Sequence, residues 1–565
     1  TEGRLLLERV LAGLEQGSAA REDRARSVVE AATKAAGDTT RPVPARLAVL
    51  QSPELEAVLV AHPLRDLVSV EGPFPAYADR PRALVGSWYE FFPRSEGATR
   101  DDATGKVTSG TFRTAAKRLE GVAAMGFDVI YLPPIHPIGA INRKGPNNTL
   151  APDSGATPPD WPGSPWAIGS AEGGHDAVHP DLGTLADFDA FVARADELGM
   201  EVALDLALQA APDHPWVTTH PEWFTTRADG TIAHAENPPK KYQDIYPINF
   251  DNDPDGIYRE VLRLVCHWID HGVRIFRVDN PHTKPLPFWE RLLAEVRRID
   301  PGVVFLSEAF TRPAMMHGLG AIGFHQSYTY FTWRNQKQEL GDYLIELAHE
   351  SDHLMRPNLF VNTPDILHAY LQYGGPAAFR VRATVAALAA PSWGVYAGFE
   401  LYEHVAVRPG SEEYLDSEKY QVRIRDWEGA EDEGRSLAPY LTKLNEIRRA
   451  HPALRLLRNV TVHASDDDSI LCFSKVASTT ESGAHEGSAP RWDDIVIVVV
   501  NLDPHGTRES MVHLDLAALG LDPHESFLVH DELSGQTWNW TEHNYVRLDP
   551  AAEPAHILTV RSPTT

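Results

Sequence analysis

Hydrophobic and polar positions change their rhythm twice along the chain. In residues 1–80 apolar side chains recur at helical spacing, and Ser52 followed by Pro53 is typical of a helix start. In residues 81–454 short apolar runs alternate with amphipathic helices, and in residues 455–565 short alternating strands are separated by turn residues. The pattern predicts an N-terminal helical module, a central strand–helix repeat and a C-terminal β-sandwich.

The central repeat predicts about eight strands. They are expected at residues 83–92, 129–132, 201–206, 273–279, 303–308, 326–331, 359–362 and 394–396. Helices are expected at residues 111–125, 185–198, 256–271 and 287–299. Parallel strands need such crossovers, and eight of them closing on themselves form a (β/α)₈ TIM barrel. The absence of a Gly-rich fingerprint after the first strand disfavours an open, doubly wound sheet.

Two connections in this region are unusually long. They span residues 135–183 and about 207–255, and each follows a predicted strand. Loops that follow barrel strands lie on the face where barrel enzymes carry their active sites. We therefore expect both connections to be functional, and the second to be an inserted loop domain.

Composition narrows the classes of partner. The 565 residues include 52 Lys and Arg against 79 Asp and Glu, a formal charge of −27 that argues against nucleic acid. No apolar run reaches the roughly 18 residues of a membrane span, so no membrane partner is expected. Two cysteines, Cys266 and Cys472, suit a reducing compartment. With no signal-peptide pattern at the start, these features predict a cytoplasmic protein.

Acidic residues fall where strands end. Asp205, Asp279, Glu308 and Asp365 each stand at or just beyond the end of an apolar run, and Arg277 shares a strand face with Asp279. One such acid is usually a structural cap, but four around one barrel mouth point to chemistry. Retaining glycosyl transfer uses two carboxyl groups about 5–5.5 Å apart, close to the spacing of about 4.8 Å between neighbouring strands. No His, Cys and acid group has metal-ligand spacing, so we expect no metal and no other cofactor.

The acid-bearing segments resemble a known family. Residues 89–95, 272–279, 305–309 and 360–365 are similar to the first barrel strand and the three acid segments of the α-amylase family, glycoside hydrolase family 13. The resemblance implies a nucleophile at Asp279, an acid/base at Glu308 and a transition-state stabiliser at Asp365, with Arg277 holding Asp279 ionised. The chain departs from the usual family pattern at Gln209, Ala210 and Pro364, which makes an ordinary amylase doubtful.

These departures and five further segments resemble a narrower branch. The segments are residues 142–148, 164–170, 239–242, 278–284 and 414–420, and the branch is the bacterial α-1,4-glucan:maltose-1-phosphate maltosyltransferases. The resemblance implies transfer of a maltosyl unit from α-maltose 1-phosphate to the non-reducing end of an α-1,4-glucan, through a β-maltosyl-enzyme. It implies a homodimer, and a helical module that is an insert of an N-terminal β-domain. The implied phosphate contacts are Lys240, Tyr242 and Asn280, and the implied maltosyl contacts are Lys144, Asn148, Gln209, Lys419 and Tyr420.

Two other readings of the same residues stay open. Another α-amylase-family hydrolase, or a trehalose-forming isomerase, would use the same acids but would not need the Lys240, Tyr242 and Asn280 set. A non-catalytic glucan-binding protein would not need the three acids. Trp88 and Trp166 could equally stack on sugar rings or belong to the core. His175 and Asp176 are expected to be an ordinary structural pair.

Overall fold

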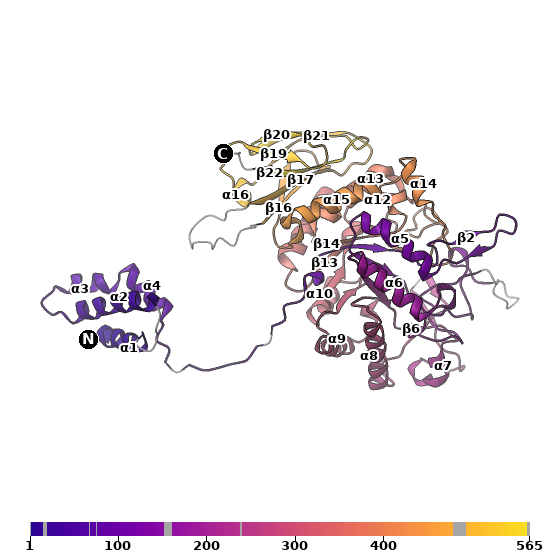
Figure 1. Cartoon of the computed structure of the whole chain (residues 1–565), viewed down its shortest axis with the longest axis horizontal. Coiled ribbons are helices and arrows are strands. Elements are labelled where there is room, and N and C mark those ends of the chain that lie inside the picture. Colours follow the sequence, from indigo (N-terminus) through magenta and orange to yellow (C-terminus); the bar gives the residue numbers. More distant parts are fainter. Residues whose placement is uncertain are drawn as a thin grey trace. The chain divides into compact units, whose positions relative to one another are not determined.

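The chain forms two compact units. The computed structural model describes residues 2–14, 20–66, 68–74, 76–151, 161–237, 240–477 and 493–561 (Figure 1). One unit is Thr1–Ala78 and the other is Asp79–Thr565.

The first unit is helical, as predicted. Its helices are α1 (Glu2–Leu14), α2 (Ala20–Gly37), α3 (Val43–Leu50) and α4 (Pro53–Ala61). Leu7, Val29 and Leu55 are among the side chains that form its small core. The predicted helix start is confirmed, because the Ser52 hydroxyl accepts a hydrogen bond from the Leu55 N–H and Pro53 occupies the first helical turn.

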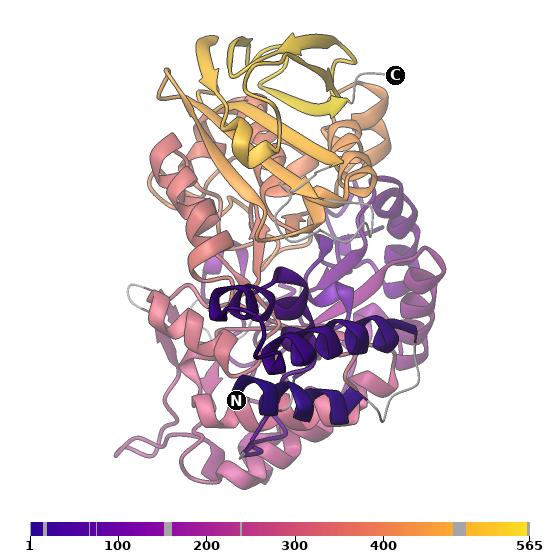
Figure 2. The same cartoon turned by 90° about the vertical axis from the view of Figure 1, so that its left-hand side faces the viewer.

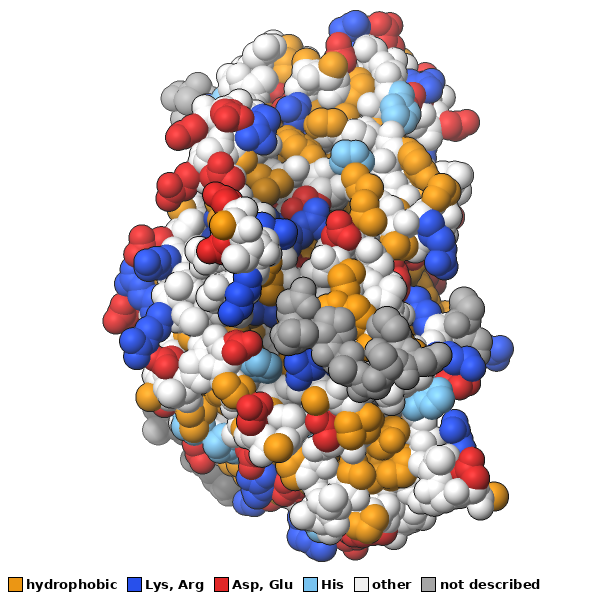
Figure 3. Space-filling model, turned by 90° about the vertical axis from the view of Figure 1, so that its right-hand side faces the viewer, with side chains coloured by type: hydrophobic (Ala, Val, Ile, Leu, Met, Phe, Trp, Pro, Cys, Tyr) orange, Lys and Arg blue, Asp and Glu red, His pale blue; other side chains and the backbone are white. Residues whose placement is uncertain are grey.

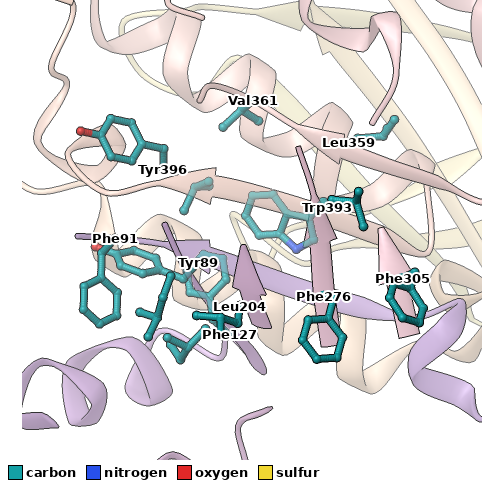
Figure 4. Packing of buried hydrophobic residues seen from close by; sticks show 14 of the residues in the cluster. Tyr89, Phe91, Phe127, Leu204, Phe276, Phe305, Leu359, Val361, Trp393 and Tyr396 are labelled. Carbon is teal, nitrogen blue, oxygen red and sulfur yellow. The ribbon is translucent and has the colours of Figure 1, made fainter. Parts of the chain in front are cut away.

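Eight parallel strands close into the predicted (β/α)₈ barrel. They are β1 (Gly86–Glu90), β4 (Val129–Leu132), β5 (Glu201–Leu206), β10 (Ile275–Val278), β11 (Val304–Ser307), β12 (Gln326–Tyr328), β13 (Pro357–Phe360) and β14 (Ser392–Tyr396). Closure is complete because β1 pairs with β4 on one side and with β14 on the other. Trp88 and Ile275 point into the barrel, so Trp88 belongs to the core. Their neighbours Tyr89 and Phe276 face the helices, and Figure 4 shows Phe276 beside Phe305 from the adjacent strand.

Amphipathic helices cover the outside of the barrel. The helices are α5 (Phe112–Ala124), α6 (Leu185–Glu197), α8 (Pro254–Asp270), α9 (Leu286–Ile299), α10 (Pro313–Ala321), α11 (Lys337–Ile345), α12 (Ala369–Tyr373), α13 (Gly375–Ala389), α14 (Trp427–Asp432) and α15 (Ala438–Ala450). In α8 the buried side chains Val261, Leu264 and Trp268 recur at helical spacing and pack on the barrel core. Short 3₁₀ turns lie at Pro81–Ala83, Pro281–Thr283 and Phe399–Leu401, and a π-helical turn lies at Glu346–Glu350.

The strand predicted at residues 326–331 is too long. Strand β12 ends at Tyr328, and Tyr330–Trp333 is a 3₁₀ turn. The cause is local, since the Thr329 hydroxyl accepts the Phe331 N–H at 3.3 Å and turns the chain out of the sheet.

The two long connections follow β4 and β5 and carry short elements of their own. These are the turns Pro146–Asn148, Pro180–Leu182 and Pro221–Trp223, helix α7 (Pro215–Thr219), and strands β6 (Gln209–Ala210), β7 (Ala235–Asn237), β8 (Lys240–Tyr242) and β9 (Tyr246–Pro247). A hairpin of β2 (Thr99–Arg100) and β3 (Val107–Thr108) follows β1. Figure 3 shows the face toward which α7 and this hairpin project, where basic and acidic side chains are interspersed.

The C-terminal region is the predicted β-domain. Its elements are the turn Pro452–Arg455, β15 (Val460–Ser465), β16 (Ile470–Ala477), β17 (Asp494–Asn501), β18 (Arg508–His513), α16 (Leu516–Leu519), β19 (Phe527–Asp531), β20 (Thr537–Trp540), β21 (His543–Leu548) and β22 (Ala555–Arg561). Strand β15 pairs first with β16 and then, at its end, with β18, so it joins two antiparallel layers (Figure 2). Cys472, Ile497 and Val546 are among the side chains of the apolar cluster that both layers share.

No helix in the described ranges is long and apolar enough to cross a bilayer. The predicted domain boundaries near residues 80, 207, 255 and 454 stay predictions.

Candidate active site

Three acids meet at one end of the barrel. Asp205 belongs to β5, and Asp279 and Glu308 directly follow β10 and β11. The register pairs Val278 with Ser307, so Asp279 and Glu308 stand at the same level on neighbouring strands, as predicted. The backbone N–H of Glu308 donates to the Val278 carbonyl at 3.0 Å and fixes that level.

Arg277 contacts the carboxyl groups of all three acids. Its Nη1 atom lies 2.9 Å from Asp205 Oδ2 and 3.0 Å from Asp279 Oδ1, and its Nη2 atom lies 2.5 Å from Glu308 Oε1. The side chain is 5% exposed, so water screens these ion pairs little. Placing Arg277 on the same face as Asp279 is confirmed, and the contacts to the neighbouring strands extend that prediction.

Tyrosines surround the guanidinium. The rings of Tyr131 and Tyr328 lie 5.6 and 5.7 Å from the Arg277 Cζ atom. The Tyr131 hydroxyl also donates to Asp205 Oδ2 at 2.5 Å. These contacts hold Arg277 in one orientation, so the positions of the carboxylates depend on it.

The two neighbouring acids have opposite pKa shifts. Burial raises the pKa of Glu308 well above its usual value, and the nearby Asp279 and Asp365 charges raise it further. Burial also raises the pKa of Asp279, but Arg277 and Lys284 outweigh that effect and the pKa of Asp279 is lowered. The shifts therefore favour an ionised Asp279 beside a protonated Glu308, the division of roles that acid-assisted attack requires.

Asp365 lies in the loop after β13 and forms an ion pair with Lys419. Burial raises the pKa of Asp365, but Lys419 outweighs it and the pKa is lowered. The Lys419 Nζ atom lies 5.3 Å from the Trp166 ring and 5.8 Å from the Tyr420 ring. The structure thus brings together Asp365, Lys419 and Tyr420, with Trp166, itself nearly buried, against them.

The residues expected to contact phosphate lie on two segments. Lys240 begins β8 and forms an ion pair with Glu413. Burial raises the pKa of Tyr242, and the charges of Lys419 and Lys240 oppose that rise, which places Tyr242 within electrostatic range of both. Asn280 directly follows Asp279 and adopts a left-handed conformation with φ of 42°. No contact of the described residues joins Lys240 to Asn280.

Two of the remaining three predicted residues, Lys144 and Gln209, connect the two long loops. The Lys144 Nζ atom is buried and donates to Gln243 Oε1 at 2.7 Å and to the Lys241 carbonyl at 3.3 Å. The Gln209 Nε2 atom donates to the Trp166 carbonyl at 3.2 Å. Asn148 has φ of 65°, and its buried Oδ1 atom accepts no hydrogen bond from the described part of the chain.

His175 is structural, but not through Asp176. The His175 ring shares a hydrogen bond of 3.1 Å with the His214 ring and stacks on Trp216. Asp176 instead pairs with Arg263 at 2.8 Å. The sequence neighbours point apart, so the expected pair does not form.

Several residues of the site were not predicted from the sequence. Asp244 is buried near Lys144, and burial raises its pKa to about 6. Glu90 ends β1 inside the barrel, is 1% exposed, and has a pKa raised well above its usual value by burial. The Lys284 Nζ atom donates to the Asp279 and Asn280 carbonyls at 3.2 Å. Lys284 stands in the segment 278–284 and Glu90 ends an apolar run, so these two had a sequence signal, whereas Asp244 lies in a long loop and had none.

Within the described ranges, no group of three or more His, Cys, Asp or Glu side chains could hold a metal ion. The side chains that the structure brings together at the site are the carboxyl groups, the cations around them and the tyrosines.

A closed parallel barrel with an Arg-bridged acid pair on adjacent strand ends is the arrangement expected from the α-amylase-family resemblance. The fold agrees, because the chain superposes on the α-amylase of Geobacillus thermoleovorans complexed with acarbose with a TM-score of 0.62. The two are 17% identical, over 85% of this chain and 99% of that one. A family model described as "GLGE, C-terminal" matches residues 462–560.

The sequence relatives narrow the class to one family. The chain is 58% identical over 563 residues to α-1,4-glucan:maltose-1-phosphate maltosyltransferase 2 of Streptomyces coelicolor, covering 100% of this chain and 80% of that protein. It is 54% identical over 558 residues to the α-1,4-glucan:maltose-1-phosphate maltosyltransferase of Mycobacterium tuberculosis, covering 99% of this chain and 76% of that protein. The chain belongs to the α-1,4-glucan:maltose-1-phosphate maltosyltransferase family, and the resemblance found in the sequence is confirmed.

Proposed function

We propose that the protein transfers a maltosyl unit from α-maltose 1-phosphate to the non-reducing end of an α-1,4-glucan and releases phosphate. The observation that carries the proposal is the Arg277 bridge, which holds Asp279 and Glu308 side by side on neighbouring strands. Retaining transfer needs such a pair, one carboxyl group as nucleophile and the other as acid and base. The names of the relatives supply the donor and the acceptor.

In the first step Asp279 attacks the anomeric carbon of the donor. The bond from that carbon to the phosphate oxygen breaks, and Glu308 gives its proton to the departing oxygen. The raised pKa of Glu308 and the lowered pKa of Asp279 support these roles. The product is a β-maltosyl ester of Asp279.

In the second step the 4-hydroxyl of a glucan end attacks the same carbon. Glu308, now ionised, takes the hydroxyl proton, and the ester bond to Asp279 breaks. Two inversions restore the α configuration, and the proton that Glu308 lost is regained.

Two lysines of the site act on different parts of the donor, Lys419 on the side of the sugar ring and Lys240 on the phosphate. Asp365, kept ionised by Lys419, stabilises the positive charge that develops on the sugar ring. Lys240 exchanges its partner Glu413 for the phosphate, with Tyr242 and Asn280 as further donors. The maltosyl unit is held by Lys144, Asn148, Gln209 and Tyr420. Lys144 has a second role, because its hydrogen bonds to Gln243 and to the Lys241 carbonyl order the loop that carries Lys240.

The test separates transfer from hydrolysis. With α-maltose 1-phosphate and a malto-oligosaccharide, each phosphate released should match one acceptor lengthened by two glucose units. Free maltose without chain growth would instead favour a hydrolase, and Asp279→Asn should abolish both products. An isomerase would need no phosphate donor, and conversion of maltose to trehalose in the absence of α-maltose 1-phosphate would reveal it.

We also propose that the protein acts in the cytoplasm. Cys266 and Cys472 form no disulfide, which supports a reducing cytoplasm. We also propose a homodimer, on the family resemblance. Sedimentation velocity of the purified protein at assay concentration tests it, and a single monomeric species would contradict it.

A further inference from the structure

A cavity lies at the end of the barrel opposite to the catalytic acids. It opens where β1, β4 and β5 begin, and its volume is about 570 Å³. That size is typical of sites for small ligands. Five arginines and two acids, Asp128 and Glu201, line it, so it is basic in a chain whose formal charge is −27.

Two of the five arginines form ion pairs with the two acids of the lining. The Arg80 Nη1 atom lies 2.7 Å from Glu201, and Arg82 lies 2.8 Å from Asp128 and 3.1 Å from Glu201. No carboxylate of the described residues forms an ion pair with the other three arginines of the lining, which come from α15 and the turn that follows it.

Arg448 is a buried cation that forms no ion pair with the described residues, although the Asp128 charge raises its pKa. It is 3% exposed and donates to the Ala390 carbonyl at 2.9 Å and the Pro391 carbonyl at 2.6 Å. Lys475 lies within electrostatic range of Arg448 and is also fully buried. Its hydrogen bonds with the described residues are all to backbone carbonyls. Burial lowers the pKa of Arg448 to about 10, while the charge of Asp128 opposes that shift and the charge of Arg455 adds to it. Burial lowers the pKa of Lys475 well below its usual value, and the charge of Arg448 adds to that shift. A buried guanidinium that forms no ion pair with the described residues is costly, and an anion bound in the cavity would offset that cost.

Arg449 and Arg455 provide donors that the fold does not use. Both are exposed. Arg449 donates one hydrogen bond, to the Gly126 carbonyl at 3.3 Å. Arg455 makes no hydrogen bond or ion pair with the described residues. The position of Arg448 and Arg449 in the last turn of α15 explains carbonyl contacts there, but it does not explain Arg455, which lies beyond that helix.

We propose that this cavity binds a small phosphate-bearing anion. Arg449 and Arg455 donate hydrogen bonds to the anion, and the buried charge of Arg448 stabilises it. Guanidinium groups suit phosphate because their paired N–H donors match two of its oxygens. Asp128 and Glu201 lie on the same cavity wall as Arg80 and Arg82, so the anion sits toward α15. The site is separate from the phosphate position of the donor, because the two lie at opposite ends of the barrel strands.

Calorimetric titration of the protein with inorganic pyrophosphate tests the proposal. The variant Arg449→Gln/Arg455→Gln should bind at this site at least about tenfold more weakly than wild type. A matched control, Arg113→Gln/Arg298→Gln, removes two exposed arginines elsewhere on the barrel and should change the affinity less than about twofold. Lys240→Gln, which alters the donor phosphate position, should leave the cavity affinity unchanged.

Three further measurements test the same proposal. A crystal soaked in pyrophosphate should show it between Arg449 and Arg455. Equal affinity of the double variant and wild type, or a cavity left without pyrophosphate in the soaked crystal, would overturn the proposal. The single variant Arg455→Gln alters a side chain that forms no hydrogen bond or ion pair with the described residues, so it should fold normally and still weaken binding. Phosphate release from α-maltose 1-phosphate should persist in the double variant, so failure of this site and failure of the proposed function are distinguishable.

Discussion

Removing the guanidinium that bridges the acids should show how much the site depends on it. Arg277→Met keeps a long apolar side chain but leaves Asp205, Asp279 and Glu308 without their shared cation. The Arg277 side chain is 5% exposed, and those of Asp205 and Glu308 are 0% and 11% exposed. Water therefore cannot replace the lost contacts. Breaking a buried ion pair by removing one partner typically costs about 3–5 kcal/mol, so we expect the free energy of unfolding at neutral pH to fall by about that amount.

The size of this loss should depend on pH, and the sign follows from the pKa shifts. In the wild type the pKa of folded Asp279 is lowered, so its contribution to stability is present above its unfolded pKa of about 3.9 and is lost as pH falls through the folded pKa. In the variant, burial dominates and raises the folded pKa. Stability is then lost as pH rises from the unfolded pKa through the new folded pKa. The penalty should therefore be small near about pH 4 and grow toward neutral pH.

Urea unfolding followed by near-ultraviolet circular dichroism, at about pH 5 and about pH 7.5, measures both quantities. Arg298→Met on α9 is the matched control, since that arginine is exposed and should change stability by less than about 0.5 kcal/mol. A loss below about 1 kcal/mol at neutral pH, or an equal loss at both pH values, would refute the reasoning. Turnover should fall by several orders of magnitude in the same variant, because the nucleophile and the acid lose their common anchor.

Three further perturbations address other parts of the structure. Lys240→Gln should raise KM for α-maltose 1-phosphate about tenfold while leaving maltose affinity unchanged, because the charge-assisted bond to phosphate is lost; equal losses for both ligands in initial-rate and titration experiments would contradict the role of Lys240. Lys419→Met removes the ion pair that lowers the pKa of Asp365, so the acid limb of the pH profile of kcat/KM should move to higher pH, whereas an unmoved limb would separate Asp365 from that limb. Gly126→Ala should lower the free energy of unfolding by about 1–3 kcal/mol, because Gly126 has φ of +84° and a Cβ atom there would meet the Arg449 guanidinium at 2.8 Å; thermal denaturation matching the wild type would show that the strain is relieved.

The barrel could be predicted because buried parallel strands leave a plain signal. Both faces of β4, β5, β10 and β11 are covered, so each strand is a nearly continuous apolar run followed by an amphipathic helix. An acid at the end of such a run is conspicuous, which made Asp279 and Glu308 recognisable. Their adjacency followed from strand order and register alone. The end of β12 was not predictable in the same way, because one hydroxyl of Thr329 decided it.

Contacts between loops that are distant in the sequence had no comparable signal. Lys419 stands 54 residues from Asp365, and Lys144 stands 99 residues from Gln243, yet each pair is in hydrogen-bond contact. Loop conformation depends on many weak interactions distributed over the fold, not on a local period of two or 3.6 residues. Family resemblance pointed to Lys144 and Lys419, but it did not reveal their partners.

By itself the sequence determined where the eight barrel strands and four of the covering helices lie, apart from the end of β12, and which acids stand at the strand ends, because burial imposes a periodic pattern on the residues that form them. Only the tertiary structure decided that one guanidinium joins three carboxylates and that neighbouring acids take opposite pKa shifts. It also placed unneutralised arginines around a cavity at the far end of the barrel. Those features depend on distances between charges brought together by folding, and on the low dielectric around them, neither of which has a local signature in the chain.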